Sequence, residues 1–188
     1  MPLGAARFGI LGGIADLGKL ELIETKTFTS GSTVDFLTLN ENTYNVHFVT
    51  FNNVQFSTDA FLLARVSDDN GSTFEASNYQ YAYQYGNTAP AFGEGKSTTA
   101  TSFTNLSGNG GATNESHNGY VYFYNLGDSA KYSFVTNHSS QMNSLGQFLF
   151  YFGSQVYTVS STINALRFLT STGTFESGSI SLYGIAES

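Results

Sequence analysis

The stretch that decides the fold is NYQYAYQY, residues 78–85. Four tyrosines occupy alternate positions from Tyr79 to Tyr85, and polar or small residues fill the positions between them. Because successive side chains of a β-strand point to opposite faces of a sheet, this period of two predicts a strand with one aromatic face.

Similar strand-like runs, separated by Gly, Asn, Asp or Ser, fill the chain on both sides of this stretch. They are ELIETKTF (21–28), STVDFLTL (32–39), YNVHFVTF (44–51), FLLARVS (61–67), YVYFYNL (120–126), KYSFVT (131–136), QFLFYF (147–152), VYTVS (156–160), NALRFLT (164–170) and SISLYGI (179–185). No window shows a sustained helical period with capping residues. Roughly eight to eleven short strands predict one all-β domain over residues 21–188, an antiparallel β-sandwich with jelly-roll topology.

Residues 86–118 interrupt this pattern, because Gly, Ser, Thr and Asn dominate them and STTATSF (97–103) is their only strand-like piece. A loop of such length in a compact domain is either functional or held by neighbouring subunits. A mobile surface loop is the alternative, and the sequence leaves both open.

Residues 1–20 form a glycine-rich stretch that we expect to be an extended N-terminal arm. Gly12 and Gly13 break its apolar centre, which disfavours a signal peptide. Such an arm buries little on itself and orders when it docks on a partner. Its apolar side chains, the expected partner-binding residues, are Leu3, Phe8, Ile10, Leu11, Ile14 and Leu17.

Composition excludes several classes of function. The 188 residues carry a net charge of −7, which repels nucleic acid, and no apolar run approaches the ~20 residues of a membrane-spanning helix. The absence of cysteine excludes disulfides and thiolate metal sites. Charged residues make up only 11% of the chain and aromatic residues 15%, a balance that is usual for extracellular or virion β-proteins.

The segment SDDNGSTF, residues 67–74, has the pattern of an Asp-box turn. An EF-hand is excluded, because aligning Gly71 with the loop glycine puts Val66 at the first ligand position and Ser77 at the twelfth. We predict a structural turn that connects two strands, with Asp69 and Asn70 capping backbone amides and Gly71 at positive φ. Its residues are Ser67, Asp69, Asn70 and Gly71.

No catalytic, metal or cofactor site is predicted. The three histidines, His47, His117 and His138, are far apart in sequence and form no metal-binding motif. No G-x-S-x-G motif is present, and a glycosidase pair of carboxylates would depend wholly on folding. The 12 Tyr and 17 Phe, without any Trp, favour a core and a subunit interface over a carbohydrate-binding platform.

Five segments together resemble a family of tailed-phage structural proteins that is common in marine viruses. They are KLELIET, YNVHFVTFNNV, SDDNGSTFEASNYQYAY, GYVYFYNLGDSAKYSFVT and the closing SGSISLYGIAES, and the resemblance covers most of residues 18–188. It implies a virion component, a trimeric jelly roll without enzymatic residues.

Three functions follow as hypotheses. The first is a non-enzymatic capsid decoration or cement protein, a homo-oligomer attached by residues 1–20 to a major capsid protein or a tail component. The second is a tail-fibre adhesin whose loops, at 86–118 or 137–147, bind a host-surface glycan. The third is a glycan hydrolase on the same sandwich. The expected glycan-binding residues of the adhesin are Asn109, Asn114 and His117.

Overall fold

The computed structural model describes residues 18–89 and 92–186. The predicted arm residues Leu3, Phe8, Ile10, Leu11, Ile14 and Leu17 therefore lie outside the described residues. Regular structure in the described ranges is entirely β, and no helix there could span a membrane. The strands are β1 (Leu20–Phe28), β2 (Thr33–Phe36), β3 (Val46–Phe56), β4 (Ala60–Ser67), β5 (Tyr79–Asn87), β6 (Phe92–Ala100), β7 (Phe103–Gly110), β8 (His117–Tyr124), β9 (Ser133–Met142), β10 (Phe148–Tyr157), β11 (Ala165–Thr170) and β12 (Phe175–Ile185).

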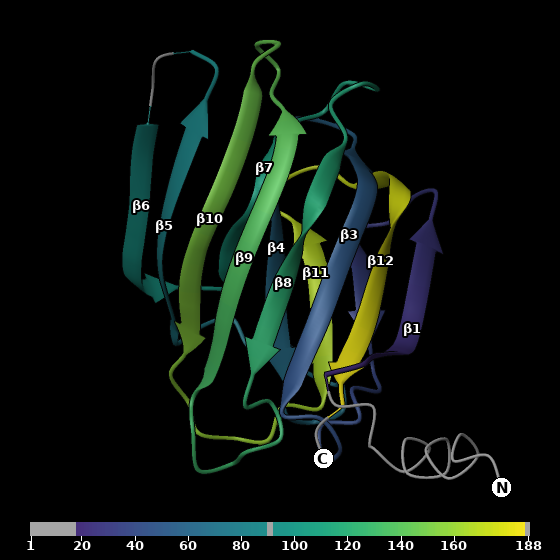
Figure 1. Cartoon of the computed structure of the whole chain (residues 1–188), viewed down its shortest axis with the longest axis vertical. Coiled ribbons are helices and arrows are strands. Elements are labelled where there is room, and N and C mark those ends of the chain that lie inside the picture. The colour runs from purple at the N-terminus through teal and green to yellow at the C-terminus, as the bar shows by residue number, and fades with distance from the viewer. Residues whose placement is uncertain (1–17, 90–91, 187–188) are drawn as a thin grey trace, which may run out of the picture.

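The strands form two antiparallel sheets of unequal size, which confirms the predicted β-sandwich. The large sheet has the order β1-β12-β3-β8-β9-β10-β5-β6, and the small sheet has the order β2-β11-β4-β7. Figure 1 shows the small sheet behind the middle of the large one, with β6 lying beyond its edge. The jelly-roll topology stays a prediction.

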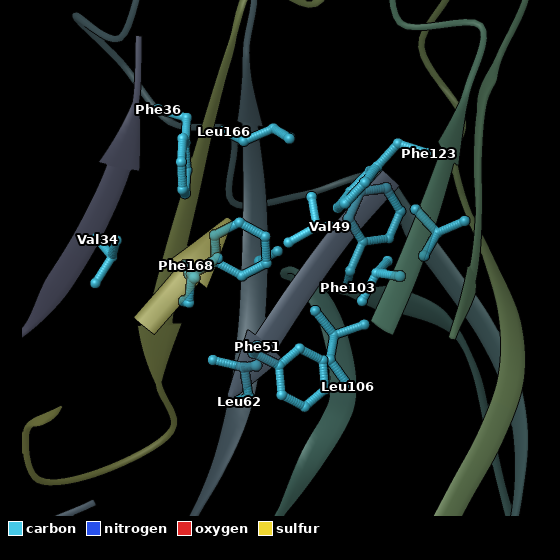
Figure 2. Close-up of a cluster of buried hydrophobic side chains, with 14 of the residues drawn as sticks. Val34, Phe36, Val49, Phe51, Leu62, Phe103, Leu106, Phe123, Leu166 and Phe168 are labelled. Atoms are coloured by element: carbon cyan, nitrogen blue, oxygen red, sulfur yellow. The ribbon is translucent and has the colours of Figure 1, made fainter. Parts of the chain in front are cut away.

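The core fills the space between the two sheets. Side chains of β3 and β8 from the large sheet meet side chains of β2, β4, β7 and β11 from the small sheet. Figure 2 shows this packing, in which the Phe168 ring lies 6.0 Å from the Phe36 ring and 6.4 Å from the Phe123 ring. These rings are fully buried, and close-packed apolar burial of this kind is the main stabilising contribution in a β-sandwich.

The prediction of a long loop at residues 86–118 is wrong for most of that segment. It contains β6 and β7, which continue the large and the small sheet respectively. β6 was missed because it contains glycines, which do not indicate a strand. The structure needs glycine there, since a Cβ at Gly93 or Gly95 would overlap the rings of Tyr85 and Tyr83 on the neighbouring strand. In β7 the two buried apolar residues are Phe103 and Leu106.

The predicted strands 147–152 and 156–160 are also corrected, because residues 148–157 form the single strand β10. Gly153 lies at its centre and pairs with Tyr83 on one side and Asn137 on the other. An added Cβ there would lie 2.5 Å from the Cβ of Tyr83 and 2.7 Å from the carbonyl oxygen of Ala82. The glycine that looks like a strand break is therefore required by close packing within the sheet.

Candidate binding groove

The large sheet has an outer face that points away from the small sheet (Figure 1). Strand register aligns small side chains across this face. Ser154 of β10 lies between Ala82 of β5 and Thr136 of β9, because it pairs with both. Lys96 of β6 follows Ala82, and Tyr122 of β8 follows Thr136, in the same transverse row.

Two parallel rows with larger side chains flank this floor. One is formed by Phe152, His138 and Tyr120, which are cross-strand neighbours. The other is formed in the same way by Val156, Phe134 and Tyr124. We call the resulting hollow the groove, and define it by its floor, Ala82, Ser154 and Thr136, and its two walls, Phe152, His138 and Tyr120 opposite Val156, Phe134 and Tyr124.

The groove is large enough for a ligand. Its main hollow has a volume of about 940 Å³, and a second hollow of about 590 Å³ shares Ala82, Lys96 and Ser154 with it. A third, of about 340 Å³, continues beyond Phe152 toward Phe92 and Phe150. Small-molecule sites commonly have volumes of roughly 300–1,000 Å³, so the groove has the size of a binding site.

The aromatic walls are exposed yet held in place by their neighbours. Phe152, Phe134 and Tyr120 are 48%, 46% and 40% exposed. The Tyr120 ring meets the His138 ring edge-on at 5.9 Å, and the Tyr122 and Tyr124 rings stack at 6.2 Å. Phe152 and Tyr120 line the main hollow, and Phe134 lines the second one beside it. Exposed rings gathered around two adjoining hollows indicate a surface for a ligand or partner, since monomeric proteins rarely expose large apolar patches.

Polar groups alternate with the rings along the groove. Gln84, Ser154, Thr136 and His138 border it and can donate or accept hydrogen bonds. The Tyr124 hydroxyl and the Thr136 hydroxyl are 3.2 Å apart and form a hydrogen bond. The groove therefore combines apolar contact area with hydrogen-bonding groups, as ligand sites do.

Tyrosines on the opposite face of β5 hold the edge of the groove from beneath. The Tyr83 ring stacks on Tyr81 at 5.4 Å, packs against Tyr151 at 5.6 Å and lies over Gly95. Asn105 Nδ2 of the small sheet donates a 2.8 Å hydrogen bond to the Tyr83 hydroxyl. Burial raises the pKa of both Tyr83 and Tyr151, so these hydroxyls stay neutral.

The structure places the four predicted turn residues in one compact turn between β4 and β5. Asp69 Oδ1 accepts hydrogen bonds from Ser67 Oγ at 2.7 Å and from the Thr73 amide at 2.8 Å, and these bonds hold the pKa of Asp69 below its usual value. Asn70 and Gly71 both have positive φ, 59° and 81°. Asn70 therefore contributes to the turn through its own backbone conformation. Its side chain makes no hydrogen bond to the backbone of the turn, so the expectation that it caps backbone amides is wrong.

The aromatic residue that ends this turn, Phe74, is buried beneath Arg167, whose guanidinium lies 4.0 Å from the ring centre. Asp35 holds the same guanidinium through two hydrogen bonds of 2.8 and 2.7 Å. These contacts join the turn to β2 and β11, so its role in the fold is structural.

The structure places the three predicted glycan-binding residues in β7, in β8 and in the connection between these strands. Asn109 lies in β7, and Asn114 is exposed in the connection between β7 and β8. His117 is fully buried and hydrogen-bonds to Ser107 Oγ and the Gly110 carbonyl, each at 3.0 Å. The expectation that His117 contacts a glycan is wrong, and burial lowers its pKa to about 4. In the second predicted loop, 137–147, residues 137–142 belong to β9, and residues 143–147 form the turn that leads into β10.

No metal centre is seen in the part of the chain that the structure describes: no three residues of His, Cys, Asp or Glu gather there in a way that could hold an ion. Two carboxylates that could have served in a glycosidase pair are instead held in ion pairs, Asp35 with Arg167 at 2.7 Å and Asp128 with Lys131 at 3.0 Å. The groove itself therefore contributes one carboxylate near its rim, that of Glu94, and the cation paired with it, Lys96.

Comparison of the chain with protein-family models, with curated proteins and with solved structures gave no match. The groove was missed by sequence reasoning because the residues of its floor and walls come from four strands between positions 82 and 156. One signal was present, the alternation of Tyr120, Tyr122 and Tyr124 in YVYFYNL, which places three rings on one face of a strand.

Proposed function

We propose that this protein is a non-catalytic glycan-binding module, of the adhesin class, and that the groove is its binding site. The observation that carries the proposal is the row of small floor residues between two rows of larger side chains, which include the exposed rings of Phe152, Tyr120 and Phe134. A sugar ring has apolar C–H faces and a periphery of hydroxyl groups. Aromatic walls provide contact for the faces, and Gln84, Thr136 and His138 provide partners for the hydroxyls.

The same surface supports a subunit interface less well. Interfaces between copies bury closely complementary surfaces with an apolar core. The groove is instead hollow, and polar groups border it throughout its length. The capsid decoration hypothesis depends on residues 1–20, which lie largely outside the described residues, so decoration, virion location and a trimeric assembly stay predictions.

Substitution of the exposed wall residues tests the proposal. We expect Tyr120→Ala and Phe152→Ala each to weaken glycan binding about fivefold, because one stacking contact contributes roughly 1 kcal/mol. Tyr132→Ala is the matched control: Tyr132 is 45% exposed, close to the exposure of Tyr120 and Phe152, but lies outside the groove. Binding is measured on a glycan array and then by calorimetry with the strongest ligand.

Filling the floor gives a second variant. Ser154 is exposed and lies in a strand, so Ser154→Ile should keep the fold while its larger side chain occupies the groove. We expect binding to be lost and the thermal unfolding temperature to stay near that of the wild type. Undiminished binding by Ser154→Ile and by both wall variants would refute the groove as the glycan site.

A further inference from the structure

We propose that the groove binds the terminal segment of a neutral glycan chain and not a stretch within the chain. This inference rests on the proposed function and adds to it the charge of the ligand and the part of the ligand that is recognised. Three features of the groove carry it: an open end, a closed end and a balanced charge.

The open end lies at β6. This strand is the last of the large sheet, so within the described residues no further strand follows it in that row. The floor passes from Ala82 of β5 to Lys96 of β6, whose side chain is 79% exposed, and ends there. A chain lying in the groove can continue past this edge into solvent.

The closed end lies at β8. There the floor row changes from Thr136 to the ring of Tyr122, which packs 4.7 Å from the ring of Phe48 on β3. Phe48 in turn lies 6.2 Å from the Tyr183 ring on β12. Three rings thus occupy the row where small residues form the floor elsewhere, and no residue of β3, β12 or β1 borders the groove. A chain in the groove ends against Tyr122.

The length of the groove fits a short oligosaccharide. Its floor crosses from β6 to β8 through β5, β10 and β9. Neighbouring strands are about 4.8 Å apart, so these four steps span roughly 19 Å. A segment of a few sugar units fills that distance, and a longer glycan must extend beyond the open end.

The charges at the groove favour a neutral ligand. Glu94 and Lys96, at the open end, pair with each other at 3.1 Å, so their charges cancel locally. His138 is the remaining basic side chain along the groove. The chain as a whole carries a net charge of −7, which repels sulfated or uronate glycans at long range.

The test uses linear tetrasaccharides attached to a surface through either their reducing or their non-reducing end. The panel holds neutral glucans, mannans and N-acetylglucosamine oligomers, with sulfated glucans as the charged counterpart. We expect one attachment to bind at least tenfold more tightly than the other, because only one end of the chain can reach Tyr122. Sulfated ligands should bind no more tightly than neutral ones.

The outcomes separate the two proposals. Equal binding to both attachments would overturn terminal recognition while leaving glycan binding in place, and tighter binding of sulfated ligands would overturn neutral selectivity. Absence of binding to every saccharide would overturn the proposed function and this inference together.

Tyr122→Val provides an internal check, because it removes the ring that closes the groove while keeping a strand-forming residue. We expect this variant to discriminate between the two attachments at least threefold less than the wild type does, while circular dichroism and thermal unfolding show that it is folded. Unchanged discrimination between the two attachments in Tyr122→Val would count against Tyr122 as the closing residue.

Discussion

Replacing Gly95 by alanine tests how the tyrosines beneath β6 hold the edge of the groove. The new Cβ would overlap the Tyr83 ring. That ring cannot move freely, since it is stacked on Tyr81 and hydrogen-bonded by Asn105 at 2.8 Å. Gly95→Ala should therefore destabilise the domain, although alanine is ordinarily the better residue in a strand.

The magnitude follows from two opposing contributions. Forcing one extra carbon into a packed site costs about 1–3 kcal/mol. Replacing a strand glycine by alanine returns about 0.5–1 kcal/mol. The net loss for Gly95→Ala is then between about 0 and 2.5 kcal/mol, with a midpoint of about 1.2 kcal/mol. In a Tyr83→Ala background the overlap is gone, so the same substitution should stabilise the domain by about 0.5 kcal/mol.

Urea unfolding of the wild type, both single variants and the double variant gives the coupling free energy directly. Gly93→Ala is the matched control, because the ring that its Cβ would overlap belongs to Tyr85. In the Tyr83→Ala background Gly93→Ala should keep its full cost. If Gly95→Ala costs the same free energy with and without the Tyr83 ring, the proposed packing is wrong.

Two further predictions concern contacts between the sheets. The Gln155 side chain accepts a hydrogen bond from the Thr104 amide and donates one to the Thr104 carbonyl, both at 2.7 Å. Gln155→Met should therefore lower the unfolding free energy by roughly 2 kcal/mol. A change below about 0.5 kcal/mol would refute a bridging role. His117, with a pKa of about 4 when folded and 6.5 when unfolded, should make stability fall as pH drops from 6.5 toward 4, because the unfolded chain binds the proton that the folded one excludes. His117→Asn should flatten this slope in unfolding measurements across that range, and an unchanged slope would refute the assignment.

The β-sandwich could be predicted because its signal is local. Alternation in residues 78–85 and in YVYFYNL reports directly on the two faces of a strand, and the structure has β5 and β8 there. β6 and β7 could not be recognised in the same way. Their glycines serve contacts with other strands, such as Tyr83 over Gly95, and a contact with a distant residue leaves no periodic trace in the sequence.

The groove depends on register, which a single sequence does not specify. A shift of one residue in any pairing moves every side chain to the other face of the sheet. Ser154, Thr136 and Ala82 are unremarkable positions in three separate strands until the pairings align them. The prediction that His117 binds a glycan was wrong for a related reason. Its neighbours in sequence are polar and resemble a loop, whereas in the folded protein it contacts Ser107, Gly110 and the Phe56 ring, whose centre lies 4.5 Å from the imidazole.

Because the two sheets differ in size, the large sheet has an edge that the small sheet does not cover, and residues there can change without disturbing the core. β6 lies beyond the small sheet (Figure 1), so its outward side chains, Glu94 and Lys96, do not belong to the buried core. Substitutions there can alter which ligands enter the groove at little cost in folding stability. Variation among natural relatives should accordingly concentrate on the outward positions of β6, with glycine retained at positions 93 and 95.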